Sequence, residues 1–176
     1  MSDEDVDVVR TGLDGDEQAV RELLAPYFAE ADERAQEHFG DVLPGLDVGA
    51  AVDADLDRLA AATVDEPLFL ARDGERVVGC VQLKHLGEST AEVKRLYVEP
   101  GYRGQGLGRR LMEAVLSGAV ADGYTTLRLG VAPYLERARA LYEDLGFEYT
   151  QPYEQSRAPE QLHDEWCFMR LSMGER

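Results

Sequence analysis

Residues 92–116 read EVKRLYVEPGYRGQGLGRRLMEAVL and change their pattern halfway. The first part has the β-favouring residues Val93, Leu96 and Val98. Further on, apolar residues recur at every fourth position, as on one face of a helix: Leu107, Leu111, Val115 and Ala119. The period changes between Pro100 and Gly104, so the pattern predicts a strand that leads through a glycine-rich turn into the N-terminus of a helix.

The glycine-rich turn predicts a binding site for an anion. The first turn of a helix has unpaired N–H groups and the positive end of the helix dipole. Gly104, Gly106 and Gly108 have no Cβ that would hold a phosphate away from the backbone. A Walker A loop ends in Gly-Lys-Ser/Thr, whereas this turn ends in Gly108, Arg109 and Arg110. A dinucleotide fingerprint has the spacing G-x-G-x-x-G, whereas the spacing here is G-x-G-x-G.

The turn closely resembles the acetyl-CoA motif of the Gcn5-related N-acetyltransferase (GNAT) superfamily. That motif is Arg/Gln-x-x-Gly-x-Gly/Ala after a strand and a short loop, and Arg103, Gly106 and Gly108 match its fixed positions. The sequence LYEDLGF at 141–147, followed by Pro152-Tyr153, resembles the second motif of the superfamily. The resemblance therefore covers nearly the whole chain.

The resemblance implies that acetyl-CoA is the cofactor and CoA a product. Backbone groups of the strand would bind the pantetheine arm and the acetyl oxygen, and the turn would hold the pyrophosphate. The implied cofactor-binding residues are Leu96, Tyr97, Val98, Arg103, Gly104, Gln105, Gly106, Leu107, Gly108 and Arg109. A solvated helix charge is the alternative for Arg109. Many members have an Asn that bonds the pantetheine arm seven residues before the second motif's Tyr, whereas this chain has Leu135 at that position.

The resemblance also implies two catalytic residues, Tyr142 and Glu92. Tyr142 would lie near the thioester sulfur and protonate the departing thiolate; its helical spacing alone indicates a core tyrosine. In histone-modifying members the base is a glutamate six residues before the bulge of this strand, and Glu92 stands six before Val98. A salt bridge to neighbouring Lys94 or Arg95, or plain surface exposure, is the alternative for Glu92.

Acceptor contacts are expected from Tyr27 and Tyr153. Tyr27 lies in a predicted helix near the place where the acceptor binds in the superfamily, and packing in the core is its alternative. Gln151 to Asp164 forms a polar segment that is long for a hairpin connection. It predicts a lid over the acceptor, with an acidic surface loop as the alternative.

The rest of the chain predicts an α/β (α+β) fold in one domain, residues 1–176, with a core at about 6–172. Length and 44% hydrophobic residues suffice for a single core. Strand signals occur at 6–10, 68–72, 77–86, 125–131 and 165–171, and the Asp73-Gly74 pair predicts a hairpin. A helix with a kink or break at Pro26 and a helix opening at Pro133 are also expected. With residues 92–116 this gives a mixed, mostly antiparallel sheet of about six to seven strands flanked by about four helices.

The chain is strongly acidic, with 18 Lys and Arg against 35 Asp and Glu and a net charge of −17. Such a surface repels nucleic acid and anionic membranes, so neither is an expected partner. It suits high ionic strength, because the Debye length falls to about 3 Å at 1 M salt. We therefore expect a halophilic source, with an acidic partner-binding surface as the alternative. The start of the sequence resembles no leader peptide, so the expected location is the cytoplasm.

No metal site is expected, because His38, His85 and His163 lie far apart and have no ligand spacing. Cys80 and Cys167 lie in apolar, strand-like contexts and are expected to be core residues rather than a disulfide.

Together these features predict an acetyl-CoA-dependent N-acetyltransferase, an acyltransferase that acts on a primary amine by direct attack in a ternary complex. A small-molecule amine is favoured, because the chain is one compact domain without an appended recognition module. The alternatives are an enzyme that acetylates protein or peptide amines, and a non-catalytic acyl-CoA-binding module, against which Tyr142 argues. A homodimer is left open.

Overall fold

The structure is a computed structural model that describes residues 5–40, 44–62 and 66–174. The described residues form seven strands: β1 (Val6–Thr11), β2 (Leu68–Asp73), β3 (Arg76–Gly87), β4 (Thr90–Val98), β5 (Thr126–Val131), β6 (Glu148–Thr150) and β7 (Cys167–Ser172). They also form four α-helices: α1 (Glu17–Phe39), α2 (Val48–Ala61), α3 (Leu107–Ala121) and α4 (Glu136–Asp144). Two short 3₁₀ turns, Pro100–Tyr102 and Glu160–Leu162, lie in the connections.

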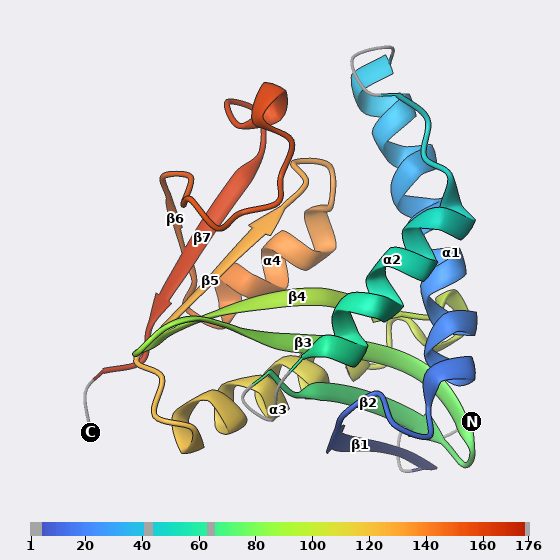
Figure 1. Cartoon of the computed structure of the whole chain (residues 1–176). Helices are drawn as coiled ribbons and strands as arrows, with labels where there is room; N and C mark the ends of the chain where they lie inside the picture. The colour runs from blue at the N-terminus through green and yellow to red at the C-terminus, as the bar shows by residue number, and fades with distance from the viewer. Residues whose placement is uncertain (1–4, 41–43, 63–65, 175–176) are drawn as a thin grey trace.

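All seven strands belong to one sheet in the order β1-β2-β3-β4-β5-β7-β6. Every neighbouring pair is antiparallel except β4 and β5, which are parallel. The Asp73-Gly74 hairpin forms as predicted, with Gly74 at a φ of 60°. The mixed, mostly antiparallel sheet with four helices confirms the predicted fold class (Figure 1).

The parallel pair β4 and β5 separates soon after it forms. Pairing in the described residues runs only from Thr90–Glu92 against Thr126–Arg128. Beyond this point the two strands diverge, and Figure 1 shows them close at one end and apart at the other. The remaining length of β4 therefore has a backbone edge that no strand of the described chain covers on this side.

A β-bulge lies in β4 just beyond the separation. Cys80 pairs with Tyr97 and Gln82 with Lys94, so two β4 residues, at positions 95 and 96, stand opposite a single residue of β3. Arg95 has a φ of 57°, a left-handed conformation that is rare for a residue with a side chain. The bulge interrupts the alternation of side chains along β4, so that Lys94 and Arg95 face the same side of the sheet.

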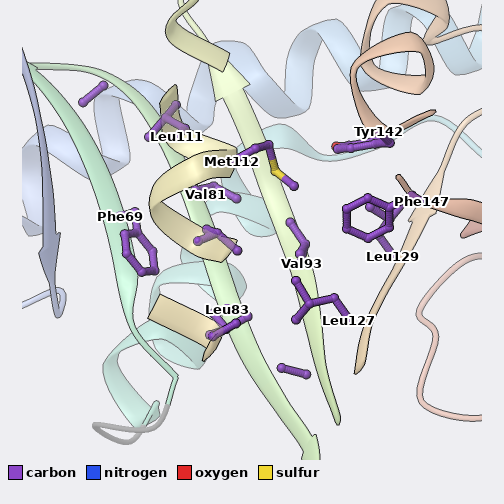
Figure 2. Close-up of a cluster of buried hydrophobic side chains, with 14 of the residues drawn as sticks. Phe69, Val81, Leu83, Val93, Leu111, Met112, Leu127, Leu129, Tyr142 and Phe147 are labelled. Carbon is purple, nitrogen blue, oxygen red and sulfur yellow. The ribbon is translucent and has the colours of Figure 1, made fainter. Parts of the chain in front are cut away.

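Two hydrophobic clusters cover the two faces of the sheet. One joins α3 to the strands and contains Val93, Leu111, Met112, Leu127 and Phe147 (Figure 2). The other joins α1 and α2 to the opposite face. The predicted apolar positions of α3, from Leu107 to Ala119, are all buried. Both cysteines are free, and Cys80 is buried, as expected for core residues.

The helix α1 runs through Pro26 as one element, so the predicted break there is wrong. A proline inside a helix costs about 3 kcal/mol, because its N–H is missing. Val20, Leu23 and Leu24 are each only 1% exposed, and burying side chains of this size contributes about 1.5–3 kcal/mol each. Burial of the apolar face outweighs the lost hydrogen bond.

Two other predicted boundaries are wrong by a few residues. The helix expected at Pro133 begins at Glu136, because the Leu135 N–H donates to the Ala132 carbonyl and closes a separate turn first. The last strand begins at Cys167 rather than Glu165, because the N–H groups of residues 165 and 166 both donate to the Leu162 carbonyl.

Candidate active site

A cleft of about 830 Å³ lies where β4 and β5 separate. It is lined by both strands, by α1, α2 and α4, and by the connection between β6 and β7. Ser156 and Pro159 belong to this connection and line the cleft, so the predicted loop borders it, and its action as a lid stays a prediction. The strand separation brings groups from both faces of the sheet into one cavity.

The side chains of β4 divide between the two faces. Val93 packs in the cluster with α3, and Leu96 and Val98 pack against that cluster. Arg95 instead binds Asp55 of α2, and Tyr97 belongs to the cluster with α1 and α2. Because side chains alternate along a strand, Glu92 and Lys94 share the α1/α2 side of the sheet with Arg95.

Tyr142 reaches the cleft from α4, on the α3 side of the sheet. It is 6% exposed, and its ring lies 5.8 Å from that of Phe147 (Figure 2). In the described part of the chain its hydroxyl has no hydrogen-bond partner. Burial raises the pKa of this phenol above its ordinary value, so it stays protonated at neutral pH and can donate a hydrogen bond into the cleft.

Glu92 enters the same cleft from the opposite side and is 3% exposed. The Tyr153 hydroxyl donates to its Oε2 at 2.5 Å, while its buried Oε1 has no hydrogen-bond partner among the described residues. The Lys94 Nζ lies 3.9 Å from Oε1. The surface exposure that was an alternative for Glu92 is therefore wrong, whereas the ion pair with Lys94 is present. One carboxylate oxygen remains available to a ligand.

Two groups around Glu92 have altered pKa values. Burial, with a further contribution from the positive charge of Arg95, lowers the pKa of Lys94 to about 8, although Glu92 opposes this shift. Burial and the nearby negative charge of Glu92 raise the pKa of Tyr153, which stays a hydrogen-bond donor. The Arg128 guanidinium lies 5.6 Å from the centre of the Tyr153 ring and helps to fix it.

The predicted anion site lies at the N-terminus of α3. Gly104 and Gly106 have φ values of 77° and 81°, and a Cβ on either would meet nothing within 4 Å. No side chain of the described residues caps this helix. The intrahelical bonds begin where the Arg110 N–H donates to the Gly106 carbonyl, so the preceding N–H groups are directed outward into open space. A Cβ on Gly108 would instead meet Leu141 at an ordinary 3.7 Å.

Arg103 and Arg109, the two arginines predicted to bind the cofactor, each form an ion pair with a carboxylate. Arg103 binds Glu30 of α1 at 2.8 and 3.0 Å and donates from Nε to the Val98 carbonyl at 2.8 Å. Arg109 pairs with Asp144, and its side chain is 43% exposed, which is typical of a solvated helix charge. For either arginine to bind a phosphate, it would have to exchange its carboxylate partner.

The other predicted residues lie around the cleft. Tyr27 lines it and packs its ring against Tyr97, with centroids 5.4 Å apart, so it belongs to both the core and the cavity wall. Burial raises the pKa of Tyr27 to about 12. Leu96 and Leu135 also line the cleft, while Gln105 and Leu107 lie in the turn before α3 and at its start. Whether these residues contact a cofactor or an acceptor stays a prediction.

Sequence reasoning misjudged one site feature and missed another. The bulge lies at residues 95 and 96, three residues after Glu92, and not six residues after it at Val98. Lys94 was considered only as a salt-bridge partner, although it lines the cleft beside Glu92. Its alternation with Glu92 along β4 was the available signal.

The described residues contain no group of three or more His, Cys, Asp or Glu side chains arranged to hold a metal ion. Among them there is also no helix with the length and apolar character needed to cross a membrane.

Comparison with known proteins gives a consistent result. A family model described as the acetyltransferase (GNAT) family matches residues 18–147. An IAA acetyltransferase of Azospirillum brasilense is 34% identical over 122 residues, which cover 69% of this chain and 76% of that protein. An uncharacterized N-acetyltransferase of Schizosaccharomyces pombe is 33% identical over 110 residues, covering 61% of this chain. The match spans only 64% of the length of the S. pombe protein.

Among solved structures, the PaiA N-acetyltransferase from Thermoplasma acidophilum in complex with coenzyme A superimposes with a TM-score of 0.69 at 15% identity. The superposition covers 95% of this chain and 98% of that one. At this identity the similarity shows a shared fold.

Proposed function

This chain belongs to the acetyltransferase (GNAT) family, and on that premise we propose that it transfers the acetyl group of acetyl-CoA to the primary amine of a small molecule. One observation carries the proposal. The separation of β4 and β5 brings Tyr142 and Glu92 to one cleft from opposite faces of the sheet. The reaction needs a proton acceptor and a proton donor in this kind of arrangement.

The residues present suit acetyl-CoA. The N-terminus of α3 offers uncapped N–H groups behind two left-handed glycines, a suitable site for a pyrophosphate. The free edge of β4 offers backbone donors and acceptors to an extended amide-containing arm. Arg103 lies between these two features. Leu135, in place of the family's Asn, offers the arm an apolar wall instead of an amide.

Acetyl-CoA supplies the thioester, and the side chains of the cleft handle the protons. A bond forms between the amine nitrogen and the acetyl carbon while the carbon–sulfur bond breaks. The Oε1 atom of Glu92 takes the proton that the amine loses, directly or through one water. The Tyr142 hydroxyl gives a hydrogen bond or its proton to the departing thiolate. Tyr153 holds the Glu92 carboxylate in place through Oε2.

A small acceptor agrees with the size of the cleft, because sites of about 300–1,000 Å³ are typical for small molecules. A peptide acceptor would need a longer groove, and residues 151–166 border the cleft instead. A non-catalytic binding module would have no use for the buried, unpartnered oxygen of Glu92. We also propose that the chain works as one domain in the cytoplasm of a halophile, because its net charge is −17.

The proposed activity predicts that amines will release CoA from acetyl-CoA in the presence of this protein. A thiol-specific reagent would follow the released CoA for amino acids, polyamines, simple amines and basic peptides, at high and low KCl. Mass spectrometry of the acceptor would confirm the added acetyl group. If CoA binds but no amine of the panel is acetylated, the chain is a binding module instead.

At the α3 N-terminus, Gly106→Val is expected to weaken CoA binding at least tenfold, because the new side chain would stand in front of the helix N–H groups. The matched control is Gly123→Val at the other end of the same helix. Gly123 has a φ of 88°, and its Cβ would also meet nothing within 4 Å, so the backbone strain is comparable. Calorimetry would measure affinity and thermal unfolding would measure strain. Equal CoA affinity in the two folded variants would contradict the assignment.

Tyr142→Phe is expected to lower kcat by roughly 10²-fold, the low end for general acid catalysis, while CoA affinity stays the same. The ring packing against Phe147 survives in this variant, so the fold is retained. Tyr149→Phe is the control, because it removes a hydroxyl that bonds Glu143 outside the cleft. Wild-type turnover in Tyr142→Phe would leave this residue with a packing role only.

Glu92→Gln is expected to lower kcat/KM by about 10²–10⁴-fold and to change the pH–rate profile, because the amide cannot accept the proton of the amine. The amide oxygen can still accept the hydrogen bond of Tyr153, so the local structure is kept. Glu99→Gln removes a carboxylate that pairs with Arg76 just beyond the same strand and serves as the control. An unaltered pH–rate profile in Glu92→Gln would remove this residue from the mechanism.

A further inference from the structure

The cleft is positively charged in an otherwise acidic protein. Among the described residues, seven Lys and Arg side chains and four Asp and Glu side chains line it, which gives this lining a net charge of +3. The whole chain carries −17. A random part of this surface would be acidic, so the cleft has a local composition that needs an explanation.

Binding of CoA explains only part of this charge. Arg103 follows β4 and precedes α3, and Arg137 lies on α4 with Tyr142, so both belong to the half of the cleft expected to hold the cofactor. Lys94, Arg95 and Arg157 belong to the other half, near Glu92. The acceptor half therefore has its own group of cations.

The acidic side chains in the acceptor half of the cleft do not neutralise all of its positive charge. Asp55 is shared by Arg95 and Arg58, with Arg58 at 3.0 Å. The nearest acid to Lys94 is Glu92, and their 3.9 Å separation is too long for a hydrogen bond. Arg157 adds a further positive charge that acts on Lys94 and helps to lower its pKa. The Lys94 side chain is only 17% exposed, so its ammonium has lost much of its hydration and a ligand carboxylate can serve as its acceptor.

Glu92 and Lys94 together form a pattern that a ligand can match. Among the described residues, the buried Oε1 of Glu92 has no hydrogen-bond donor, and Glu92 is the one carboxylate within 4 Å of the Lys94 Nζ. The two atoms are 3.9 Å apart, so they present a negative and a positive group side by side. A molecule whose amine and carboxylate are joined through one or two carbons presents the opposite pattern at a similar spacing.

We propose that the acceptor is an amino acid or a closely related molecule, whose amine meets Glu92 and whose carboxylate is bound by Lys94. This inference rests on the proposed acetyl transfer and names its substrate class. Lys94 selects the acceptor, and Glu92 accepts the proton. Arg157 adds a positive charge at the border of the cleft, where it is exposed to solvent. Plain amines and polyamines lack the anion that this half of the cleft requires and bind weakly.

The test uses acceptor pairs that differ by one carboxylate, such as L-phenylalanine with 2-phenylethylamine, and L-leucine with 3-methylbutylamine. Binding in the presence of CoA would be followed by the fluorescence of Trp166, the chain's one tryptophan, which lines the cleft. This readout needs no turnover. Kinetics with acetyl-CoA would give KM and kcat for the same pairs. The carboxylated member of each pair is expected to bind at least tenfold more tightly.

The variants separate charge recognition from other roles of Lys94. Lys94→Gln is expected to raise KM for the amino acid about 10–100-fold, in the range of a lost charged hydrogen bond, without raising KM for the decarboxylated partner. Lys94→Arg keeps the charge and restores much of the affinity. Lys84→Gln is the matched control, because Lys84 lies on neighbouring β3 opposite Glu92 but outside the cleft lining.

Equal binding of both members of each pair, or an equal loss for both in Lys94→Gln, would overturn the proposal. A fall in kcat for both members in Lys94→Arg would show that Lys94 acts as a base, which also contradicts it. If no amine is acetylated although amino acids bind preferentially, the proposed function fails while the charge selection stands.

Discussion

The left-handed backbone of Arg95 is the constraint on which the site depends. A residue with a side chain in this conformation costs about 1–3 kcal/mol, and it persists only where its surroundings fix it. Here the guanidinium binds Asp55 of α2 and Gln82 of β3 in a nearly dry environment. Removing one partner from such a buried pair typically costs 3–5 kcal/mol, more than the strain. The pair therefore holds the bulge, and the bulge turns both Lys94 and Arg95 toward the α1/α2 side while Leu96 returns to the α3 side.

In the same region β4 separates from β5. This separation leaves backbone N–H and C=O groups of β4 that a ligand can bind. A central strand normally has both backbone edges paired, whereas β4 has only three parallel pairs with β5 in the described residues. Its remaining N–H and C=O groups on that side must find water or a ligand. An extended arm with its own amides can take the place of a strand there. The two hydrophobic clusters pack against the sheet on both faces beside this opening.

The sequence predicted those parts of the fold that depend on interactions between residues close together in the chain. The strand, glycine turn and helix of residues 92–116 follow from periodicity. The bulge could not be placed, because a left-handed arginine has no local signature and depends on Asp55, 40 residues away in the sequence. The bond from Tyr153 to Glu92 joins residues 61 positions apart, so neither sequence pattern nor spacing indicates it.

Long-range and short-range electrostatic interactions have different effects on the acceptor amine: the first attract it, and the second select it. The acidic surface attracts amines of every kind, since they are cations in solution, and this attraction is not selective. At high salt it is screened beyond about 3 Å, so it has little influence under the conditions for which such a surface is suited. Contacts of Glu92 and Lys94 are screened much less, because both side chains are largely buried. Lys94 repels a purely cationic amine at this short range, and an acceptor that carries its own carboxylate avoids that repulsion.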